Sequence, residues 1–196
     1  MNANLPSMMQ TWLQCMKCGY RTDLFKERKF KCPKCNSLYD VRHDFAQAKT
    51  SWVLKPIFVC RYPSFYMRSF DSWKGSGVWR YKELIMPHLP PEYIVSLGEG
   101  NVPIVQAGAN LRQWLGIKNV WLILEGMTPT GSFKDFGMTV LVSVAQAAGI
   151  EAIGCSSTGD TSAAASAYAA AAGMKCFCLL PKGKITPAQL AQPLVH

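Results

Sequence analysis

The chain of 196 residues lacks any run that is both long and apolar enough to cross a bilayer. Its first residues are polar, so it also lacks the basic segment followed by an apolar run that marks a secretory leader. Alanine-rich residues 163–172 are too few and too small to form a membrane helix. These absences argue against a membrane-spanning protein and predict a soluble, cytoplasmic one.

Acidic side chains are scarce, with 12 Asp and Glu against 21 Lys and Arg, which gives a net charge of +9. Residues 1–50 hold nine basic and four acidic residues, whereas residues 96–196 hold six and five. A basic region of this kind binds nucleic acid or an anionic metabolite, or is simply a solvated face. The last is the commonest case, and we expect it here.

The eight cysteines fall into two groups, and four of them form two Cys-x-x-Cys pairs separated by thirteen residues. Two such turns facing each other place four thiolates at tetrahedral positions, which predicts a structural zinc site in a ribbon-like module over residues 1–45. Because all four ligands are cysteine, no position is left for a catalytic water. The alternatives are a redox dithiol and unpaired thiols, and His43 is expected at the surface. The four cysteines are Cys15, Cys18, Cys32 and Cys35.

The other four cysteines lie among apolar residues, where cysteine usually acts as a small buried hydrophobe. Nothing in their spacing indicates a secreted disulfide framework. They are Cys60, Cys155, Cys176 and Cys178.

Residues 46–95 form a connecting segment that is rich in aromatic residues and interrupted by proline and glycine. Within it, residues 79–89 predict a short helix. Aromatic side chains can stack nucleobases, but we expect these to line a core or a docking surface. They are Trp52, Phe58, Phe65, Tyr66, Phe70, Trp73 and Trp79.

From about residue 96, strand-like and helical patterns alternate. Residues 120–124 predict a buried strand, and the helix that follows runs to about Ala148 and stops at Gly149. Ser132 opens this helix, and Asp135 three residues later makes the start similar to a capping box.

Two further strands are predicted at residues 152–155 and 176–180, with a helix over residues 161–172 between them. A last helix opens at Thr186 with proline at its first position. Such alternation predicts an α/β fold with parallel strands and right-handed crossovers. Because strand-to-helix loops then share the carboxyl edge of the sheet, Lys134 and residues 156–161 should face one crevice.

Lys134 lies in the first turn of a predicted helix, directly after a strand and a glycine-containing loop. The positive end of the helix disfavours an ammonium there, so Lys134 should release its proton more easily than a surface lysine. A lysine that is neutral near physiological pH is what Schiff-base chemistry requires. Position alone would favour a solvent-exposed lysine. The second loop on the same edge and the scarcity of competing charges favour a lysine that reacts with an aldehyde cofactor instead.

Residues 156–161 carry hydroxyl side chains and backbone N–H groups at the start of a helix. Such a turn binds a carboxylate or a phosphate without a charged side chain, although a simple helix cap has the same composition. The alanine-rich helix that follows can approach other backbone closely, which suits a helix beside a cofactor. Close packing alone also explains it.

Three motifs resemble the fold-type II pyridoxal-phosphate enzymes. SFKD at residues 132–135 is similar to their lysine motif, and STGDTS at residues 157–162 is similar to their substrate-carboxylate loop. GEGNVP at residues 98–103 resembles the segment before the catalytic lysine, with valine where threonine is usual. Within that group, the motifs and the sequence from residue 181 onward are most similar to the threonine synthases, some of which carry the Cys-x-x-Cys pairs.

The resemblance covers residues 75–196 well and the ribbon more loosely. It implies that residues 96–196 are the N-terminal part of a three-layer α/β domain with a parallel sheet. It also implies a lyase that uses pyridoxal phosphate to convert O-phosphohomoserine and water to threonine and phosphate. Lys134 would bind the cofactor and move protons at Cα and Cβ, Phe133 and Asp160 would contact the cofactor, and the substrate anions would be bound by Ser157, Thr158 and Thr161.

Asp160 departs from most of the group, which has asparagine there in contact with the phenolic oxygen of the cofactor. The plant-like threonine synthases share the aspartate. A carboxylate beside a phenolate is unfavourable, so either Asp160 is protonated or the contact is rearranged.

The sequence has no counterpart of the group's later glycine-rich loop for the cofactor phosphate. We therefore expect a truncated chain that is inactive alone, and a homo-oligomer is considered only for the complete protein. One alternative is another fold-type II lyase, such as a dehydratase. The other is a zinc-ribbon module that binds nucleic acid, which would leave Lys134 and residues 156–161 unexplained.

Overall fold

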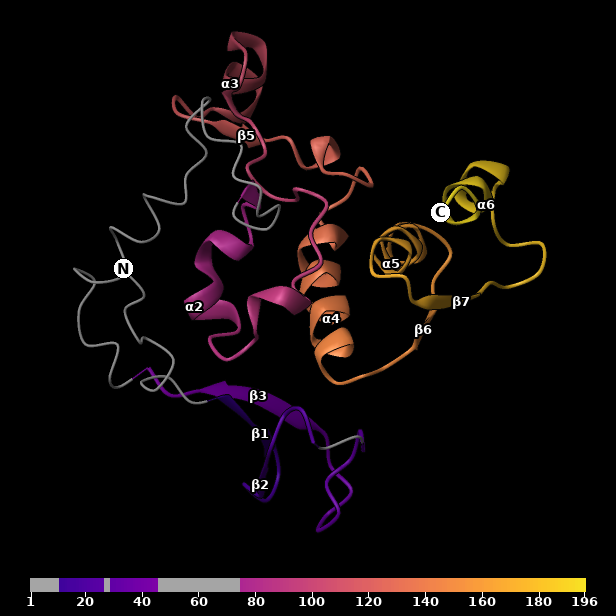
Figure 1. Ribbon diagram of the computed structural model, residues 1–196. Coiled ribbons are helices and arrows are strands. Elements are labelled where there is room, and N and C mark those ends of the chain that lie inside the picture. The colour runs from indigo at the N-terminus through magenta and orange to yellow at the C-terminus, as the bar shows by residue number, and fades with distance from the viewer. Residues whose placement is uncertain (1–10, 27–28, 46–74) are drawn as a thin grey trace.

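The computed structural model describes residues 11–26, 29–45 and 75–196. Figure 1 shows an antiparallel sheet at one end, a hairpin with a short helix at the other, and longer helices between them. Among the described residues, no helix has both the length and the apolar character needed to cross a membrane.

The N-terminal sheet has three antiparallel strands in the order β2-β1-β3. They are β1 (Thr11–Cys15), β2 (Arg21–Thr22) and β3 (Tyr39–His43). We call residues 11–45 the ribbon. Strand β3 follows the second cysteine pair and places Tyr39 opposite Cys15.

The segment after residue 75 contains a 3-10 turn (Trp79–Tyr81), the one-turn helix α2 (Lys82–Ile85) and a second 3-10 turn (Pro91–Tyr93). The helix predicted over residues 79–89 is thus wrong in length. Pro87 explains the early end, because the residue before a proline is disfavoured in helical geometry. Six of the predicted aromatic residues lie outside the described residues: Trp52, Phe58, Phe65, Tyr66, Phe70 and Trp73.

A projecting hairpin follows, in which β4 (Ile104–Gln106) and β5 (Trp121–Ile123) pair antiparallel on either side of α3 (Ala109–Leu115). The prediction of a buried parallel strand at residues 120–124 is wrong, since Trp121 is 61% exposed. An apolar run favours a strand, but it specifies neither the partner strand nor the burial.

Helix α4 (Lys134–Ala147) begins and ends close to the predicted residues, with Gly149 just beyond its end. The capping-box prediction is wrong. The Asp135 carboxylate does not reach back to the start of the helix but accepts hydrogen bonds from the N–H and the hydroxyl of Thr130.

The last part of the chain follows the predicted alternation. Strands β6 (Ala152–Ser156) and β7 (Lys175–Leu179) are parallel, and α5 (Asp160–Ala171) connects them. Helix α6 (Pro187–Leu194) starts with the predicted proline, and Thr186 forms a capping box with its third residue. This parallel unit confirms the α/β class.

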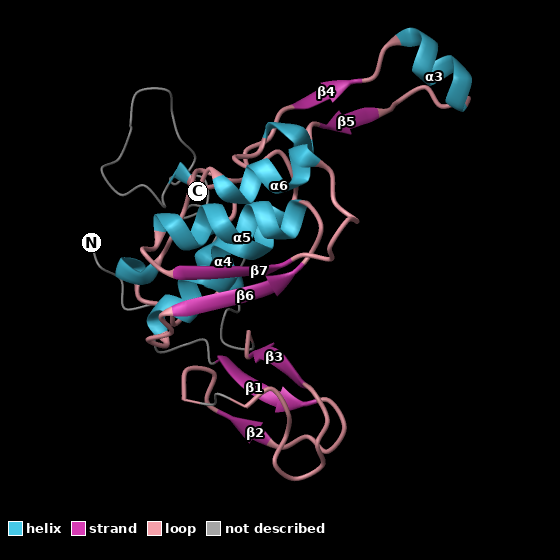
Figure 2. Ribbon diagram, turned by 90° about the vertical axis from the view of Figure 1, so that its right-hand side faces the viewer, coloured by secondary structure: helices cyan, strands magenta, loops and turns pink. Residues whose placement is uncertain are grey.

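Helix α5 lies at the centre of this unit, in contact with both strands on one side and with α4 and α6 elsewhere (Figure 2). Its small side chains allow this close packing, because eight consecutive residues, Ser162 to Ala169, are buried. Val142 and Met138 of α4 pack against it. On its other side, α4 packs against a second apolar cluster.

The second cluster has Trp79, Met86 and Leu89 at its centre. Leu24 and Phe25 of the ribbon pack against it, as do Val140, Val144 and Ala147 of α4. The ribbon and the lysine-bearing helix therefore share one apolar core.

Candidate functional site

The loop before Lys134 is fixed by internal hydrogen bonds. We call residues 128–133 the lysine loop. Asp135 is fully buried, and its carboxylate accepts from the Thr130 N–H at 2.8 Å and from the Thr130 hydroxyl at 2.6 Å. The Thr128 hydroxyl donates to the Ser132 carbonyl at 2.9 Å. These bonds fix the backbone of the lysine loop and so place Lys134 at the start of α4.

The Lys134 side chain is half-buried and lies over its neighbour, with Nζ 4.1 Å from the centre of the Phe133 ring. Phe133 is 54% exposed, so the amine lies near the surface of the site. Among the described residues, no carboxylate forms a salt bridge with Lys134. Its amine is therefore not committed to an ion pair.

We call residues 156–161 the hydroxyl turn. The Ser157 hydroxyl accepts from the Gly159 N–H at 3.3 Å, and the Ser162 hydroxyl donates to the Gly159 carbonyl at 2.6 Å. Ser157 and Thr158 line a hollow at the carboxyl ends of the parallel strands. The other residues lining it are Ser156, Leu179, Leu180 and Pro181.

The lysine loop and the hydroxyl turn meet, although β5 is not part of the parallel sheet. The Ser132 hydroxyl donates to the Asp160 carboxylate at 3.1 Å. From α6, the Gln192 side chain donates to the Thr130 carbonyl at 3.0 Å. The packing of α4 on α5 brings the two segments together, instead of the shared sheet edge that we expected.

The structure thus places the predicted site residues in two adjoining groups. Lys134 and Phe133 lie at the start of α4, while Ser157 and Thr158 line the hollow, of which neither Lys134 nor Phe133 is a lining residue. Asp160 connects the groups, and Thr161 lies in the first turn of α5. Their roles stay predictions.

Sequence reasoning missed the supporting roles of Thr130, Asp135 and Gln192. Asp135 is the last residue of the lysine motif, so its position beside Lys134 was a usable signal. Gln192 had no such signal, because its contact with Thr130 spans 62 residues.

A second candidate site lies in the ribbon, at the two cysteine turns. The Cys15 carbonyl accepts from the Gly19 N–H at 3.1 Å, and the Cys32 carbonyl accepts from the Asn36 N–H at 2.8 Å. Gly19 and Asn36 both have positive φ, of 72° and 58°. Glycine and asparagine tolerate this conformation best, so the residue after each pair lets the chain fold back around the sulfurs.

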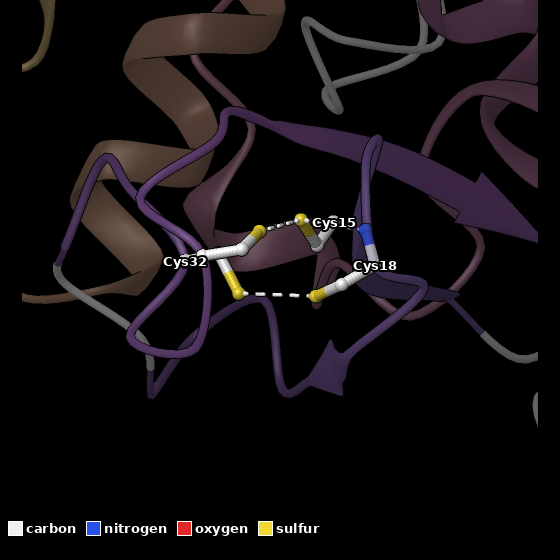
Figure 3. Close-up of side chains that lie close together, drawn as sticks. Cys15, Cys18 and Cys32 are labelled. Carbon is white, nitrogen blue, oxygen red and sulfur yellow. Dashed lines mark hydrogen bonds between the residues drawn. The ribbon is translucent and has the colours of Figure 1, made fainter.

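The four sulfurs of the ribbon converge, and all lie within 4.8 Å of one another. Figure 3 shows the side chains of Cys15, Cys18 and Cys32 pointing toward the same point. The Sγ atoms of Cys15 and Cys35 are 3.3 Å apart, and those of Cys18 and Cys32 are 3.6 Å apart. In a tetrahedral site with zinc–sulfur bonds of about 2.3 Å the sulfurs lie about 3.8 Å apart.

Local hydrogen bonding favours the thiolate at Cys15, whereas, despite a backbone hydrogen bond from Tyr20, desolvation and the neighbouring cysteine thiols raise the pKa of Cys18 to about 12. The backbone N–H of Cys18 donates to Cys15 Sγ at 3.5 Å and is the main reason why the pKa of Cys15 is lowered to about 6. A thiolate is the form that binds a metal. His43 instead forms a hydrogen bond with Thr11 at 2.9 Å and is not a member of the cluster.

The remaining described cysteines form a different group. Cys155, Cys176 and Cys178 are half-buried, and the Sγ atoms of Cys155 and Cys178 are 3.7 Å apart. Burial, with help from the Cys178 thiol, raises the pKa of Cys155 to about 12. Burial also raises the pKa of Cys176, so Cys155 and Cys176 favour the neutral thiol, in keeping with the predicted packing role. Cys60 lies outside the described residues.

Comparison with known proteins gives consistent results. Residues 95–193 match the family described as pyridoxal-phosphate dependent enzyme. The threonine synthase of Methanocaldococcus jannaschii is 39% identical over 183 residues, which are 93% of this chain and 41% of that protein. Threonine synthase 2, chloroplastic, of Arabidopsis thaliana is 41% identical over 173 residues, 82% of this chain and 31% of that protein.

The threonine synthase of Mycobacterium bovis is 50% identical over 102 residues, 52% of this chain and 28% of that protein. The chain therefore spans less than half the length of these relatives.

Proposed function

Because the chain belongs to the family of pyridoxal-phosphate dependent enzymes, we propose that it forms the lysine-bearing part of a threonine synthase. The proposed reaction converts O-phosphohomoserine and water to threonine and phosphate. One observation carries the proposal from the structure. The Ser132 hydroxyl binds the Asp160 carboxylate, which holds the lysine loop against the hydroxyl turn.

The residues present fit the cofactor. A primary amine that is free of any described ion pair is the group that binds an aldehyde covalently, and Lys134 offers one beside an exposed aromatic ring. When bound, pyridoxal phosphate supplies an electron sink for the breaking of bonds to Cα of an amino acid. Phe133 would pack beside the cofactor, and Asp160 would lie near it.

Lys134 has a second task in this proposal, because its amine can move protons at Cα and Cβ of the substrate while phosphate leaves from Cγ and water then adds at Cβ. The lysine loop gives that amine a fixed starting point, since Asp135 and Thr130 hold the backbone immediately before it.

The hydroxyl turn would bind the substrate anions. Ser157, Thr158 and Thr161 offer hydroxyl donors, and the start of α5 adds backbone N–H groups and the positive end of the helix. Such a site holds a carboxylate without a buried cation. It would therefore orient the substrate while leaving Lys134 as the basic group of the site.

For the ribbon we propose a structural zinc ion bound by Cys15, Cys18, Cys32 and Cys35. The convergence of the four sulfurs supports it. Four cysteine ligands fill the tetrahedron, so the ion would stabilise the ribbon and take no part in the reaction.

The direct test measures phosphate release from O-phosphohomoserine by the full-length protein, with Lys134→Ala as the control. We expect release with threonine as the co-product, and its loss in the control. Formation of a 2-oxo acid from serine or threonine, without phosphate release, would instead assign the protein to the dehydratases. Release that survives in Lys134→Ala would remove Lys134 from the reaction.

A further inference from the structure

Glu99, in the motif at residues 98–103, is fully buried although it is acidic. No ion pair involving Glu99 is found among the described residues. A buried carboxylate is costly unless hydrogen bonds replace the water it has lost. Glu99 meets this requirement through donors from its own segment and from residue 76. Its oxygens accept from the hydroxyls of Ser76 and Ser96, and from the Leu97 N–H at 3.0 Å.

The segment that carries Glu99 is locked to residues 75–78. The Gly77 N–H donates to the Glu99 carbonyl at 2.7 Å, and the Asn101 side chain donates to the Gly75 carbonyl at 2.8 Å. A Cβ atom at Gly77 would overlap the backbone of Gly100 and Asn101. The two chain segments therefore approach as closely as glycine allows. These contacts fix the segment that carries Glu99 against residues 75–78.

One further donor comes from a distant element. The hydroxyl of Tyr168, a fully buried residue of α5, donates to Glu99 Oε2 at 2.8 Å. Burial, followed by the Glu99 carboxylate, raises the pKa of Tyr168, so its hydroxyl keeps the proton that it donates. This hydrogen bond connects α5 to the segment that carries Glu99.

Helix α5 begins at Asp160, so whatever fixes α5 also fixes the hydroxyl turn at its N-terminus. Most buried side chains of α5 are Ala or Ser, so few of them are large enough to fix the position of the helix by themselves. The charge-assisted hydrogen bond of Tyr168 therefore adds a specific anchor to α5.

We propose that Glu99 is a positioning residue that acts through Tyr168 to set the place of the hydroxyl turn relative to Lys134. Glu99 itself touches neither the turn nor Lys134. The inference rests on the proposed function in one respect only, namely that the hydroxyl turn binds the substrate anions. The positioning itself is a property of the fold and is testable without any ligand.

The primary test is amide hydrogen exchange of the full chain, by region, for Tyr168→Phe, Glu99→Gln and the double variant. Loss of a buried hydrogen bond to a charged group should speed exchange in residues 156–171 by about tenfold in each variant. Exchange in α4 should stay within about twofold of the parent chain. Because both changes break the same link, the double variant should exceed the stronger single variant by little.

Ser143→Ala is the matched control. It removes a buried hydroxyl of α4 that accepts from the Val95 N–H at 2.8 Å and donates to the Thr139 carbonyl at 2.6 Å. Neither of these bonds involves Glu99 or Tyr168. This control should speed exchange in α4 rather than in residues 156–171. Equal acceleration of both regions by Tyr168→Phe, or no acceleration of residues 156–171, would overturn the proposal.

A second readout separates positioning from simple stabilisation. With the full-length protein loaded with pyridoxal phosphate, L-threonine binding is measured by the change in cofactor absorbance. Tyr168→Phe should weaken L-threonine binding about tenfold while borohydride labelling of Lys134 stays within about twofold. Equal losses of both would contradict a positioning role. A full-length protein that takes up no cofactor would count against the proposed function, and the exchange data alone would then decide the role of Glu99.

Discussion

In the described part of the ribbon only Cys15 and Cys32 are buried, whereas α5 alone buries eight consecutive residues. The ribbon has turns, a small sheet and four converging sulfurs, but no apolar core of its own. The α/β part has two apolar clusters on either side of α4. The comparison teaches that the α/β part is stabilised by packing, whereas in our proposal the ribbon depends on the cross-link that the zinc ion would provide.

The cysteines of the two regions differ in how their pKa values are shifted. In the ribbon, a backbone N–H lowers the pKa of Cys15 to about 6, whereas, despite a backbone hydrogen bond from Tyr20, desolvation and the neighbouring thiols raise the pKa of Cys18 to about 12. In the parallel sheet, burial raises the pKa of Cys155 and favours the neutral thiol. The four sulfurs of the ribbon converge, as the proposed zinc site requires, whereas the half-buried cysteines of the parallel sheet take part in packing.

Removal of the metal should have the largest effect, and it should be confined to the ribbon. Structural zinc sites of this type contribute about 10–16 kcal/mol, more than a module without an apolar core can replace. We expect a chelator to abolish amide protection in residues 11–45 while α5 stays protected. Ribbon protection that is unchanged by chelation, or by Cys15→Ser, would contradict the proposed cross-link.

Trp79→Ala should destabilise the α/β part strongly. The Trp79 side chain is fully buried, and its indole N–H donates to the Thr139 hydroxyl at 2.7 Å. Truncation of a buried tryptophan costs about 3–5 kcal/mol, which urea denaturation would measure. Trp114→Ala is the control, because Trp114 is 80% exposed and its loss should change stability by less than about 0.5 kcal/mol.

Phe25→Ala tests the contact between the two regions. Phe25 packs against the cluster of Trp79, Met86 and Leu89, and it is only partly buried, so we expect a loss of about 1–2 kcal/mol. The effect should disappear in the presence of a chelator, since an unfolded ribbon no longer makes the contact. Phe30→Ala serves as the control, because Phe30 is 90% exposed. An equal effect of Phe25→Ala with and without metal would show that the regions are not coupled.

Thr186→Ala should have the smallest effect. The Thr186 hydroxyl accepts from the Gln189 N–H at 3.2 Å in the capping box of α6. Loss of such a cap costs about 1 kcal/mol. Hydrogen exchange should report fraying of α6 alone, and a matching change in α5 would indicate that α6 is part of the central packing unit.

The sequence predicted what depends on neighbouring residues. The two cysteine turns, the β6–α5–β7 unit and the start of α6 at Pro187 are all specified by short patterns of glycine, proline and hydroxyl side chains. Two expectations failed for a common reason. The pairing of β5 with β4 and the binding of Asp135 to Thr130 depend on which groups meet after the chain has folded.

Long-range side-chain contacts could not be predicted from one sequence. The bond between Tyr168 and Glu99 joins residues 69 positions apart, and the bond between Trp79 and Thr139 joins residues 60 apart. The motif at residues 98–103 was recognised, but nothing in its composition indicated that its acid would be buried or which helix it would hold.

The most direct test of the catalytic assignment is borohydride trapping of pyridoxal phosphate on the full-length protein, followed by peptide mapping. The account predicts that the label lies on Lys134 and that Lys134→Ala abolishes it. Label on another lysine, such as Lys182 or Lys184, or no label at all, would contradict it.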